Sequence, residues 1–548
     1  MRRALIAVVA LSAATLPLTA ALAATTAPAV KPYPQPTEAE RRETIHEFVE
    51  DAMRTASERS GDVFFLPKKY NFVTGVGPDK LNTGHVKVNG QITRITGTGI
   101  SHGIPWDYDR DLPLIFWGPG FVKPGQVIRT RTSQQDVAPT LAELIGCPRP
   151  SHAKGRALTE AFLPTKRKPK VILTMLFDQA GEHYYRVQPG KTPFIDKLKR
   201  EGTYFANTRV SHVDMETAMG HVAIGTGAFP RDHGLPSNQF WHAGAGDDFY
   251  CMEGPVHSQP THMMSPTVGD WYLRHTQNKA LLFSYCWADR AAIGMGGHGS
   301  FFAGNKKPWI FYFDQKAGKL TTNPEYYEIP SYLKDMTPDA AVEALTGPSR
   351  VWMDHPIKGG REVVATPAMP VFDSEVVRKV IAQEAFGQDD ITDLMYVTLK
   401  STDLAGHLFG QESEEAGAVL AEQDRQFEAI VKALEAKVGR ENLVVALTAD
   451  HGGPPLPELS GGKRLWEKDF LKALNAHFDK TPDGFPVAQY VSGTQIWIDH
   501  LQLKASKATL DDVKRFVANY KIDGVPFFET AYTKDEIQAM RRTGVYGF

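Results

Sequence analysis

The sequence is poor in cysteine and has no excess of either charge. Its 548 residues include only Cys147, Cys251 and Cys286, which excludes a disulfide framework or a zinc-finger spacing and leaves at most one disulfide. Lysine and arginine number 61 against 63 aspartates and glutamates, a formal net charge of -2. So balanced a chain gives no electrostatic reason to expect a nucleic acid or a membrane surface as partner.

The first 23 residues predict export. Arg2 and Arg3 precede an apolar stretch that ends in small residues at 21–23, where a signal peptidase would cut. Pro17 interrupts the stretch, which favours a cleaved Sec-type signal peptide, with an uncleaved anchor as the alternative. The mature protein is therefore expected in the periplasm or secreted, with no stable membrane span.

Apolar runs alternate with helical patterns through much of the chain. Continuous apolar runs at 171–177, 394–400 and 442–449 are typical of parallel strands buried on both faces. Residues 414–439 predict a long amphipathic helix between the last two runs. Two further strands and a helix are predicted ahead of them, at 62–67, 112–117 and 133–146. The alternation favours an α/β fold with a mostly parallel central sheet flanked by helices.

Acidic and imidazole side chains follow each of the three long apolar runs. Asp178 follows the first run, Asp403 and His407 follow the second, and Asp450 and His451 follow the third. The carboxyl ends of parallel strands meet at one edge of a sheet, so these side chains should lie together. Any one of them could be a helix-capping Asp or a core His, but five at strand ends favour a site for Zn²⁺ or a similar ion.

Residues 210–234 hold a candidate nucleophile. We expect Thr217 to begin a helix, where free backbone amides and the helix dipole favour an anion. A threonine hydroxyl is a poor nucleophile unless a metal ion activates it, so this role depends on the acidic and imidazole set. A plain helix-capping threonine is the alternative.

The order of these motifs resembles the alkaline phosphatase superfamily. The motifs are an Asp at a strand end, then ETAMGH, DLAGH and ADHGG. They are most similar to the branch that includes the Thr-nucleophile phosphatases, the type I phosphodiesterases and the nucleotide pyrophosphatases. The resemblance implies two divalent metal ions, with Zn²⁺ the first choice. By position it assigns one ion to Asp178, Thr217, Asp450 and His451. It assigns the other to Asp403, His407 and one more histidine.

That last histidine is expected to be His102. Downstream of His451 the chain offers only His477 and His500, and neither lies in the family's context of an acidic, Tyr-containing turn, a strand and Gly-x-Gly. The segment TGISHGIPWDYDRDLPLIFWGPG at 98–120 has that context. Residues 53–162 therefore resemble the usual end of the fold placed at the front, which implies a circular permutation. A separate small domain, with His500 as the ligand, is the alternative.

The permutation implies a division of the chain. The parts are a signal peptide at 1–23, a linker and helix at 24–52, the permuted C-terminal part of the catalytic core at 53–162, a joining linker at 163–170 and the main part of the core at 171–548. Residues from about 236 to 390 are rich in glycine, proline and aromatics without a clear period. We expect them to form a cap or insertion over the site.

Two matches and one departure bear on the substrate. Asn238 matches a family asparagine that donates to a phosphoryl oxygen, and Arg290 matches the Arg of a Lys-Asp-Arg-Ala-Ala segment in the phosphomonoesterases. Ala288 stands where that segment has Lys, which weakens the case for a monoester because a dianion needs compensating positive charge. His298 could replace the Lys, but we expect a surface histidine there.

These residues predict an exported, metal-dependent hydrolase of small-molecule phosphoric esters. The favoured reading is an alkaline-phosphatase-type phosphomonoesterase that forms a phosphothreonine at Thr217, with Asn238 and Arg290 as further catalytic residues. The alternatives are a phosphodiesterase or nucleotide pyrophosphatase, and a non-catalytic metal-binding protein that kept the fold.

Overall fold

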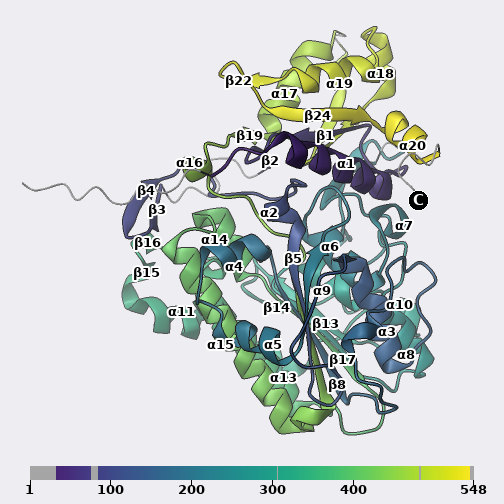
Figure 1. The fold of residues 1–548 in the computed structure, drawn as a ribbon, viewed down its shortest axis with the longest axis vertical. Helices are drawn as coiled ribbons and strands as arrows, with labels where there is room; N and C mark the ends of the chain where they lie inside the picture. Colours follow the sequence, from purple (N-terminus) through teal and green to yellow (C-terminus); the bar gives the residue numbers. More distant parts are fainter. Residues whose placement is uncertain (1–32, 76–83, 243, 305, 481–482, 543–548) are drawn as a thin grey trace, which may run out of the picture.

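A large mixed sheet forms the centre of the molecule (Figure 1). The computed structural model describes residues 33–75, 84–242, 244–304, 306–480 and 483–542, so the predicted signal peptide lies outside the described residues. The strand order is β14 (Lys319–Thr321), β13 (Trp309–Asp314), β12 (Leu282–Cys286), β17 (Asp393–Leu399), β8 (Val171–Phe177), β18 (Leu443–Thr448), β5 (Asp111–Trp117), β9 (Thr203–Arg209) and β6 (Gln126–Ile128), with β7 (Thr132–Ser133) also beside β9.

The three long apolar runs form the neighbouring strands β17, β8 and β18, which are parallel. Val171 lies opposite both Asp393 and Leu443, so the strands begin at the same level. At the other end Phe177 pairs with Leu399, and Leu176 pairs with Thr448. The residues that follow these strands therefore reach one edge of the sheet. The fold class predicted from the sequence is confirmed.

Both faces of the central strands are covered by helices, as the continuous apolar runs predicted. From β8, Leu173 and Met175 pack in the same core as residues of α13 (Ala368–Gln383) and α15 (Glu414–Val438). Ile172 and Leu176 point to the opposite face and pack with α3 (Val137–Ile145) and α8 (Val268–His275). Figure 1 shows these helix pairs on the two sides of the sheet.

A second, antiparallel sheet lies beyond the edge where the central strands end (Figure 1, top). Its order is β20 (Ala488–Val491), β21 (Gln495–Ile498), β1 (Val63–Pro67) and β24 (Phe528–Thr533). Phe65 of β1 packs there with Phe470 of α17 (Glu467–Phe478) and Val513 of α19 (Leu510–Ala518). Strands from the two ends of the sequence thus share one small core.

The segment that precedes β5 is held by a buried ion-pair network. Arg110, the last residue of α2 (Asp107–Arg110), pairs with Glu47 and Asp51 of α1 (Glu38–Thr55). Glu47 also pairs with Arg209 of β9 at 2.6 Å. A buried guanidinium is tolerated only when it is paired in this way. The network fixes the chain just after residue 102 against the central sheet.

The range 236–390, predicted as cap or insertion, contributes to the core as well. It supplies β12, β13 and β14 of the central sheet, together with α8 and α13, which pack on its two faces. The remaining elements of this range are β10 (Gln239–His242), β11 (Asp247–Tyr250), α9 (Asp289–Gly296), α10 (Ser300–Ala303), α11 (Asp339–Thr346), β15 (Val351–Trp352), β16 (His355–Pro356) and α12 (Arg361–Val364). Part of the range is therefore core rather than cap.

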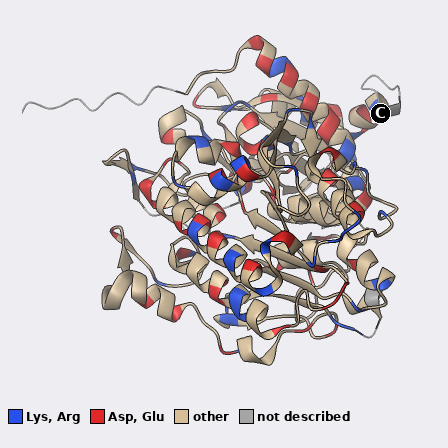
Figure 2. Cartoon of the chain, turned by 60° about the horizontal axis from the view of Figure 1, so that its bottom comes forward, with Lys and Arg blue, Asp and Glu red and all other residues tan. Residues whose placement is uncertain are grey.

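Other elements connect these parts. They are β2 (Phe72–Thr74), β3 (His85–Val88), β4 (Gln91–Arg94), α4 (Glu182–Val187), α5 (Pro193–Glu201), α6 (Thr217–Thr226), α7 (Pro230–His233), α14 (Ser401–Phe409), α16 (Pro457–Ser460), β19 (Arg464–Trp466), α18 (His500–Ala505), β22 (Lys521–Ile522), β23 (Val525–Pro526) and α20 (Lys534–Arg542). Acidic and basic residues are interspersed over them (Figure 2).

Two structural features bear on membrane spans and on disulfides. Among the described residues, no helix is both long and apolar enough to cross a membrane. Cys147, Cys251 and Cys286 are all buried, and none forms a disulfide.

Candidate active site

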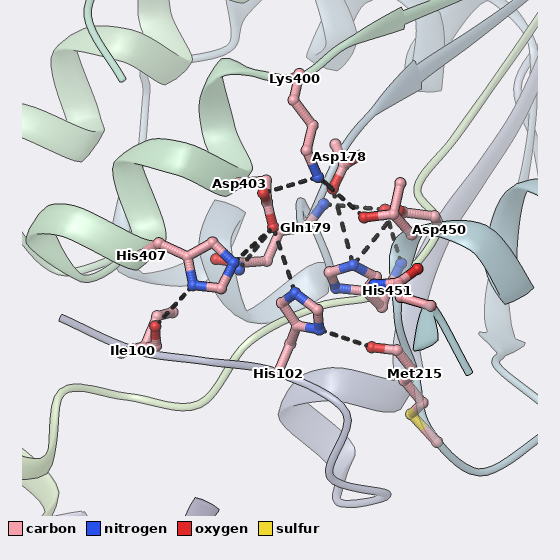
Figure 3. Close-up of polar contacts among 12 residues, drawn as sticks. Ile100, His102, Asp178, Gln179, Met215, Lys400, Asp403, His407, Asp450 and His451 are labelled. Carbon is pink, nitrogen blue, oxygen red and sulfur yellow. Dashed lines mark hydrogen bonds and ion pairs between the residues drawn. The ribbon is translucent and has the colours of Figure 1, made fainter. Parts of the chain in front are cut away.

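The predicted site residues meet at the carboxyl edge of the central sheet (Figure 3). Asp178 directly follows β8, and Asp450 lies two residues beyond β18. Asp403 and His407 lie one turn apart on α14, which follows β17. His102 comes from the segment ahead of β5 and reaches the same edge. The site therefore combines neighbouring strand ends with a loop from the first part of the chain.

Six side chains form two groups whose geometry suits a metal ion. The first group is Asp178, Asp450 and His451, and the second is His102, Asp403 and His407. Within each group the possible ligand atoms all lie within 4.8 Å of one another. The rings of His102 and His451 have centroids 3.9 Å apart, so the two groups are adjacent.

The three imidazoles in these groups are oriented alike by backbone carbonyls. Nδ1 of His102 donates to Met215 O at 3.0 Å, and Nδ1 of His407 donates to Ile100 O at 2.9 Å. Nδ1 of His451 donates to Gly452 O at 2.9 Å. A proton on Nδ1 leaves the Nε2 lone pair available, which is the usual arrangement for a metal-binding histidine. Burial, together with the neighbouring His451 and His407, holds the pKa of His102 well below its usual range.

The carboxylates are crowded, and their pKa values diverge. Burial and the nearby Asp450 raise the pKa of Asp178 well above its usual range. Burial alone would raise the pKa of Asp403, but the Lys400 ammonium and His407 outweigh it and hold that pKa well below its usual range. Burial likewise opposes ionisation of Asp450, yet His451 and His221 lower its pKa. Such a mixture of perturbed carboxyl groups close together is typical of a functional site.

The first group fits a divalent cation. Asp178 Oδ2, Asp450 Oδ2 and His451 Nε2 are buried and have no hydrogen-bond partner among the described residues. Buried polar atoms are rarely left unpaired, so three such acceptors directed at one another need a positive partner. Carboxylate and imidazole are the ligand types that Zn²⁺ and similar ions take.

Thr217 begins α6, as predicted, and its hydroxyl contacts Lys400, which pairs with a carboxylate of each group. Thr217 Oγ1 accepts from Lys400 Nζ at 3.0 Å and from Arg290 Nη2 at 3.3 Å. A Cβ on Gly220 would lie 2.6 Å from Asp450 O, so a glycine is required for the first turn of α6 to approach Asp450 this closely. The free amides of this helix start also favour an anion beside Thr217.

Asn238 and Arg290 line a cavity of about 510 Å³ together with His102, Asp403 and His407 of the second group. Asn238 Oδ1 accepts from the Ala218 amide at 3.0 Å, which orients its Nδ2 group as a donor toward the cavity. The wall also includes Lys400, Arg361, Glu216, Glu467, Trp287 and Tyr490. Burial and the charge of Asp214 raise the pKa of Glu216 to about 7.

Two histidines considered from the sequence lie outside both groups. His500 Nε2 bonds Asp62 at 3.0 Å and belongs to neither group. His298 was expected at the surface, but it is buried, with Nδ1 2.9 Å from Asp270 and Nε2 3.0 Å from Met263 O. It therefore does not replace the missing lysine at Ala288. Its burial follows from its place after α9, where Asp270 of α8 satisfies its polar atoms.

Sequence reasoning missed Lys400 and Gln179. Lys400 Nζ pairs with Asp178 at 2.8 Å and with Asp403 at 2.7 Å, so it bridges the two groups. Burial alone would lower its pKa, but these carboxylates outweigh that effect and raise it. Gln179 donates its backbone amide to Asp450 at 3.0 Å and its Nε2 to Asp403 at 3.1 Å. The available signal was position alone, since Lys400 directly follows β17 and Gln179 lies two residues beyond β8.

Comparison with known proteins identifies relatives with this chemistry. The model of the type I phosphodiesterase / nucleotide pyrophosphatase family matches residues 172–543. The chain is 26% identical over 406 residues to alkaline phosphatase PafA of Elizabethkingia meningoseptica, covering 64% of this chain and 72% of that protein. It is 26% identical over 413 residues to alkaline phosphatase PhoV of Synechococcus elongatus, covering 66% and 74%.

A solved structure shares the fold. The crystal structure of PafA aligns with a TM-score of 0.55 at 23% identity, over 65% of this chain and 77% of that one. The family match spans well over half of the chain and contains both groups except His102. The chain belongs to the type I phosphodiesterase / nucleotide pyrophosphatase family of the alkaline phosphatase superfamily, and it is a hydrolase of phosphoric esters.

Proposed function

We propose that the protein is a phosphomonoesterase that transfers the phosphoryl group first to Thr217 and then to water. The observation that carries this proposal is the position of the Thr217 hydroxyl. It accepts hydrogen bonds from two cationic side chains, and one of them, Lys400, also pairs with a carboxylate of each group of metal-ligand type. A hydroxyl in that setting is suited to act as a nucleophile toward an anionic ester.

Two metal ions would be held by the two groups, with Zn²⁺ the first choice. Asp178, Asp450 and His451, together with Thr217, would hold one ion, and His102, Asp403 and His407 would hold the other. Bound ions would supply Lewis-acid stabilisation of the negative charge on the attacking and leaving oxygens.

The side chains around Thr217 then act on the ester. Thr217 loses its proton to water, Oγ1 forms a bond to phosphorus, and the bond to the alcohol oxygen breaks. The alcohol takes a proton from water as it leaves. Arg290 and the Nδ2 group of Asn238 would bind the phosphoryl oxygens, over which charge is spread in the transition state. Water next attacks phosphorus, the bond to Oγ1 breaks, and Thr217 regains its proton as phosphate is released.

A phosphodiesterase is the second candidate function. Ala288 stands where the resemblance calls for a lysine, and its side chain is buried beside Trp287 of the cavity wall rather than offering charge. A diester carries one negative charge, so it needs less positive charge from the protein than a monoester dianion.

We also infer that the chain is circularly permuted relative to its family. The family match begins at residue 172, yet β5 at 111–117 lies inside the central sheet and His102 lies in the second group. Phe48 of α1 packs with Ile537 of α20, so the two places that the family order would join are close together. A chain rearranged to place residues 53–162 after residue 542 should fold and keep its activity. Loss of the native fold would count against the permutation.

Export through the segment 1–23 remains part of the proposal. The paired arginines and the apolar run support it, and N-terminal sequencing of the protein made in its own cell tests it. A start near residue 24 is expected, whereas an intact Met1 would contradict cleavage.

The test of the reaction compares two esters. We expect zinc-loaded protein to hydrolyse p-nitrophenyl phosphate with a higher kcat/KM than bis-p-nitrophenyl phosphate. Thr217→Ala should retain metal and lose turnover, whereas Thr217→Ser keeps the hydroxyl and should retain part of the activity. A preference for the diester would support the second candidate. Full activity in Thr217→Ala would refute the phosphothreonine route.

A further inference from the structure

Lys400 is a buried lysine whose charge is held at the centre of the site. It follows β17 and precedes α14, and its side chain is 1% exposed. Its ammonium group contacts three oxygens, from Asp178 at 2.8 Å, Asp403 at 2.7 Å and Thr217 at 3.0 Å. An ammonium has three N–H donors, so each is satisfied by one of these oxygens. Burying the charge is tolerable only because of this full set of partners.

The position of Lys400 is set by the sheet rather than by a flexible loop. Leu399 pairs with Phe177 in the parallel register, which places Lys400 beside Asp178 at the strand ends. Asp403 lies one turn further along on α14. Its two carboxylate partners belong to different groups, so the ammonium lies between them (Figure 3).

Two cationic side chains from separate elements converge on Thr217 Oγ1. Lys400 reaches it from the end of β17, and Arg290 reaches it from the first turn of α9. A phosphoryl group bonded to that oxygen would therefore lie next to both charges. A monoester dianion benefits more from a second fixed charge than a diester monoanion, because the attraction scales with the product of the charges.

We propose that Lys400 is a catalytic residue that supplies this second positive charge and makes phosphomonoesters the preferred substrates over phosphodiesters. The positive charge that is absent at Ala288 is then provided from another strand. The inference rests on the proposed role of Thr217 as the attacking oxygen.

The test compares two neutral variants with a matched control. Lys400→Met keeps the length of the side chain, and Lys400→Gln keeps hydrogen-bond donors while removing the charge. Lys69→Met is the control, because Lys69 is also a buried lysine but pairs with Asp107 outside the cavity wall. Three quantities are measured for each protein: kcat/KM for p-nitrophenyl phosphate and for bis-p-nitrophenyl phosphate, the inhibition constant or Kd of orthophosphate, and the zinc content.

Loss of the Lys400 charge should lower kcat/KM for the monoester more than kcat/KM for the diester. We expect both Lys400 variants to lower the monoester-to-diester ratio of kcat/KM about 10- to 100-fold, in line with the loss of a charged hydrogen bond. Orthophosphate binding should weaken about 10-fold or more, zinc content should not fall, and Lys69→Met should match the wild type. Equal losses on both esters with unchanged orthophosphate binding would overturn the proposal. So would a loss of zinc whose replacement restores the ratio, since Lys400 would then only position ligands.

Failure of the proposed function gives a different result. If the wild type hydrolyses neither ester, the phosphomonoesterase proposal is wrong, and orthophosphate binding decides the role of Lys400 alone. Weaker orthophosphate binding in Lys400→Met and Lys400→Gln would still support a charge that binds the phosphoryl group. Unchanged binding would overturn that role too.

Discussion

The two groups at the sheet edge are built in different ways. Asp178, Asp450 and His451 are fully buried and come from the ends of the neighbouring strands β8 and β18. In the other group His102 and His407 are partly exposed, and His102 belongs to a segment that the sheet does not itself position. The first group therefore forms with the sheet, whereas the second needs a loop from the first part of the chain to dock. Substitutions in one group should therefore have effects that differ from those of substitutions in the other group.

Removal of metal should affect both groups and have the largest effect. Chelation should reduce hydrolysis to background, because crowded carboxylates and unpaired Nε2 atoms lose their positive partner. The chelated protein should also unfold at a lower temperature, since an ion present at about 100 times its Kd contributes about 2.7 kcal/mol. Calorimetry and ester hydrolysis, with zinc added back as the control, measure both effects. Undiminished hydrolysis by protein shown to be metal-free would contradict the account.

Damage to the buried group should be the next most severe. Asp450→Asn removes a carboxylate beside His221 and His451, and we expect activity to fall on the order of 10³-fold. Elemental analysis should find less metal bound, with the other group still occupied. Metal content and activity like those of the wild type would show that Asp450 is not a ligand.

The loop-borne ligand should have a smaller and separable effect. His102→Ala should lower metal affinity at the second group at least about 10-fold while the buried group keeps its ion. His500→Ala is the matched control, because His500 bonds Asp62 and belongs to neither group. If His500→Ala loses metal and His102→Ala does not, the assignment of His102 and the proposed permutation are both wrong.

The smallest effect on activity is expected from a substitution of Glu47, through which α1 anchors the segment after His102. Burial alone would raise the pKa of Glu47, but Arg110, Arg131 and Arg209 outweigh it and lower that pKa from 4.5 to about 2. A carboxylate with a depressed pKa stabilises the fold above its unfolded pKa and loses that contribution as the pH falls through its folded pKa. Glu47→Gln should therefore cost about 3 kcal/mol at neutral pH.

The pH dependence of this loss of stability distinguishes a charge effect of Glu47 from a packing effect. The difference in unfolding free energy between wild type and Glu47→Gln should shrink as the pH falls from 4.5 to about 2. Denaturant titrations across that range measure it. Glu143→Gln, on the exposed face of α3, is the control for the same substitution away from the ion-pair network. A difference that stays constant with pH would mean that Glu47 acts through packing.

Much of the fold followed from pattern, and the exceptions have physical reasons. The strands β8, β17 and β18 were predicted because burial on both faces leaves a continuous apolar run. β12 is equally buried and β13 is buried except at its two end residues, but both lie within 236–390, where turns and aromatic residues hide any period. The place of β5, antiparallel to both of its neighbours, could not be derived from its own residues.

The candidate site likewise contains residues that the sequence predicts and residues that it does not. The acidic residues and histidines could be predicted to meet because each follows a strand or lies in a motif, and the structure brings them together. Lys400 could not be predicted from pattern, because a lysine that ends an apolar run is usually solvated. Only the register with β8 shows that it turns inward to Asp178. Glu467 and Tyr490 complete the cavity wall from the region of the second sheet, which no local pattern reveals.

The central claim is that Thr217 carries the phosphoryl group, and trapping that group tests it most directly. Zinc-loaded protein would be mixed with p-nitrophenyl phosphate, quenched in acid within the first turnovers, digested and mapped by mass spectrometry. The account predicts a phosphoryl group on Thr217, absent in Thr217→Ala and in protein quenched before substrate is added. Rapid turnover with no phosphorylated Thr217, or with the phosphoryl group on another residue, would contradict it.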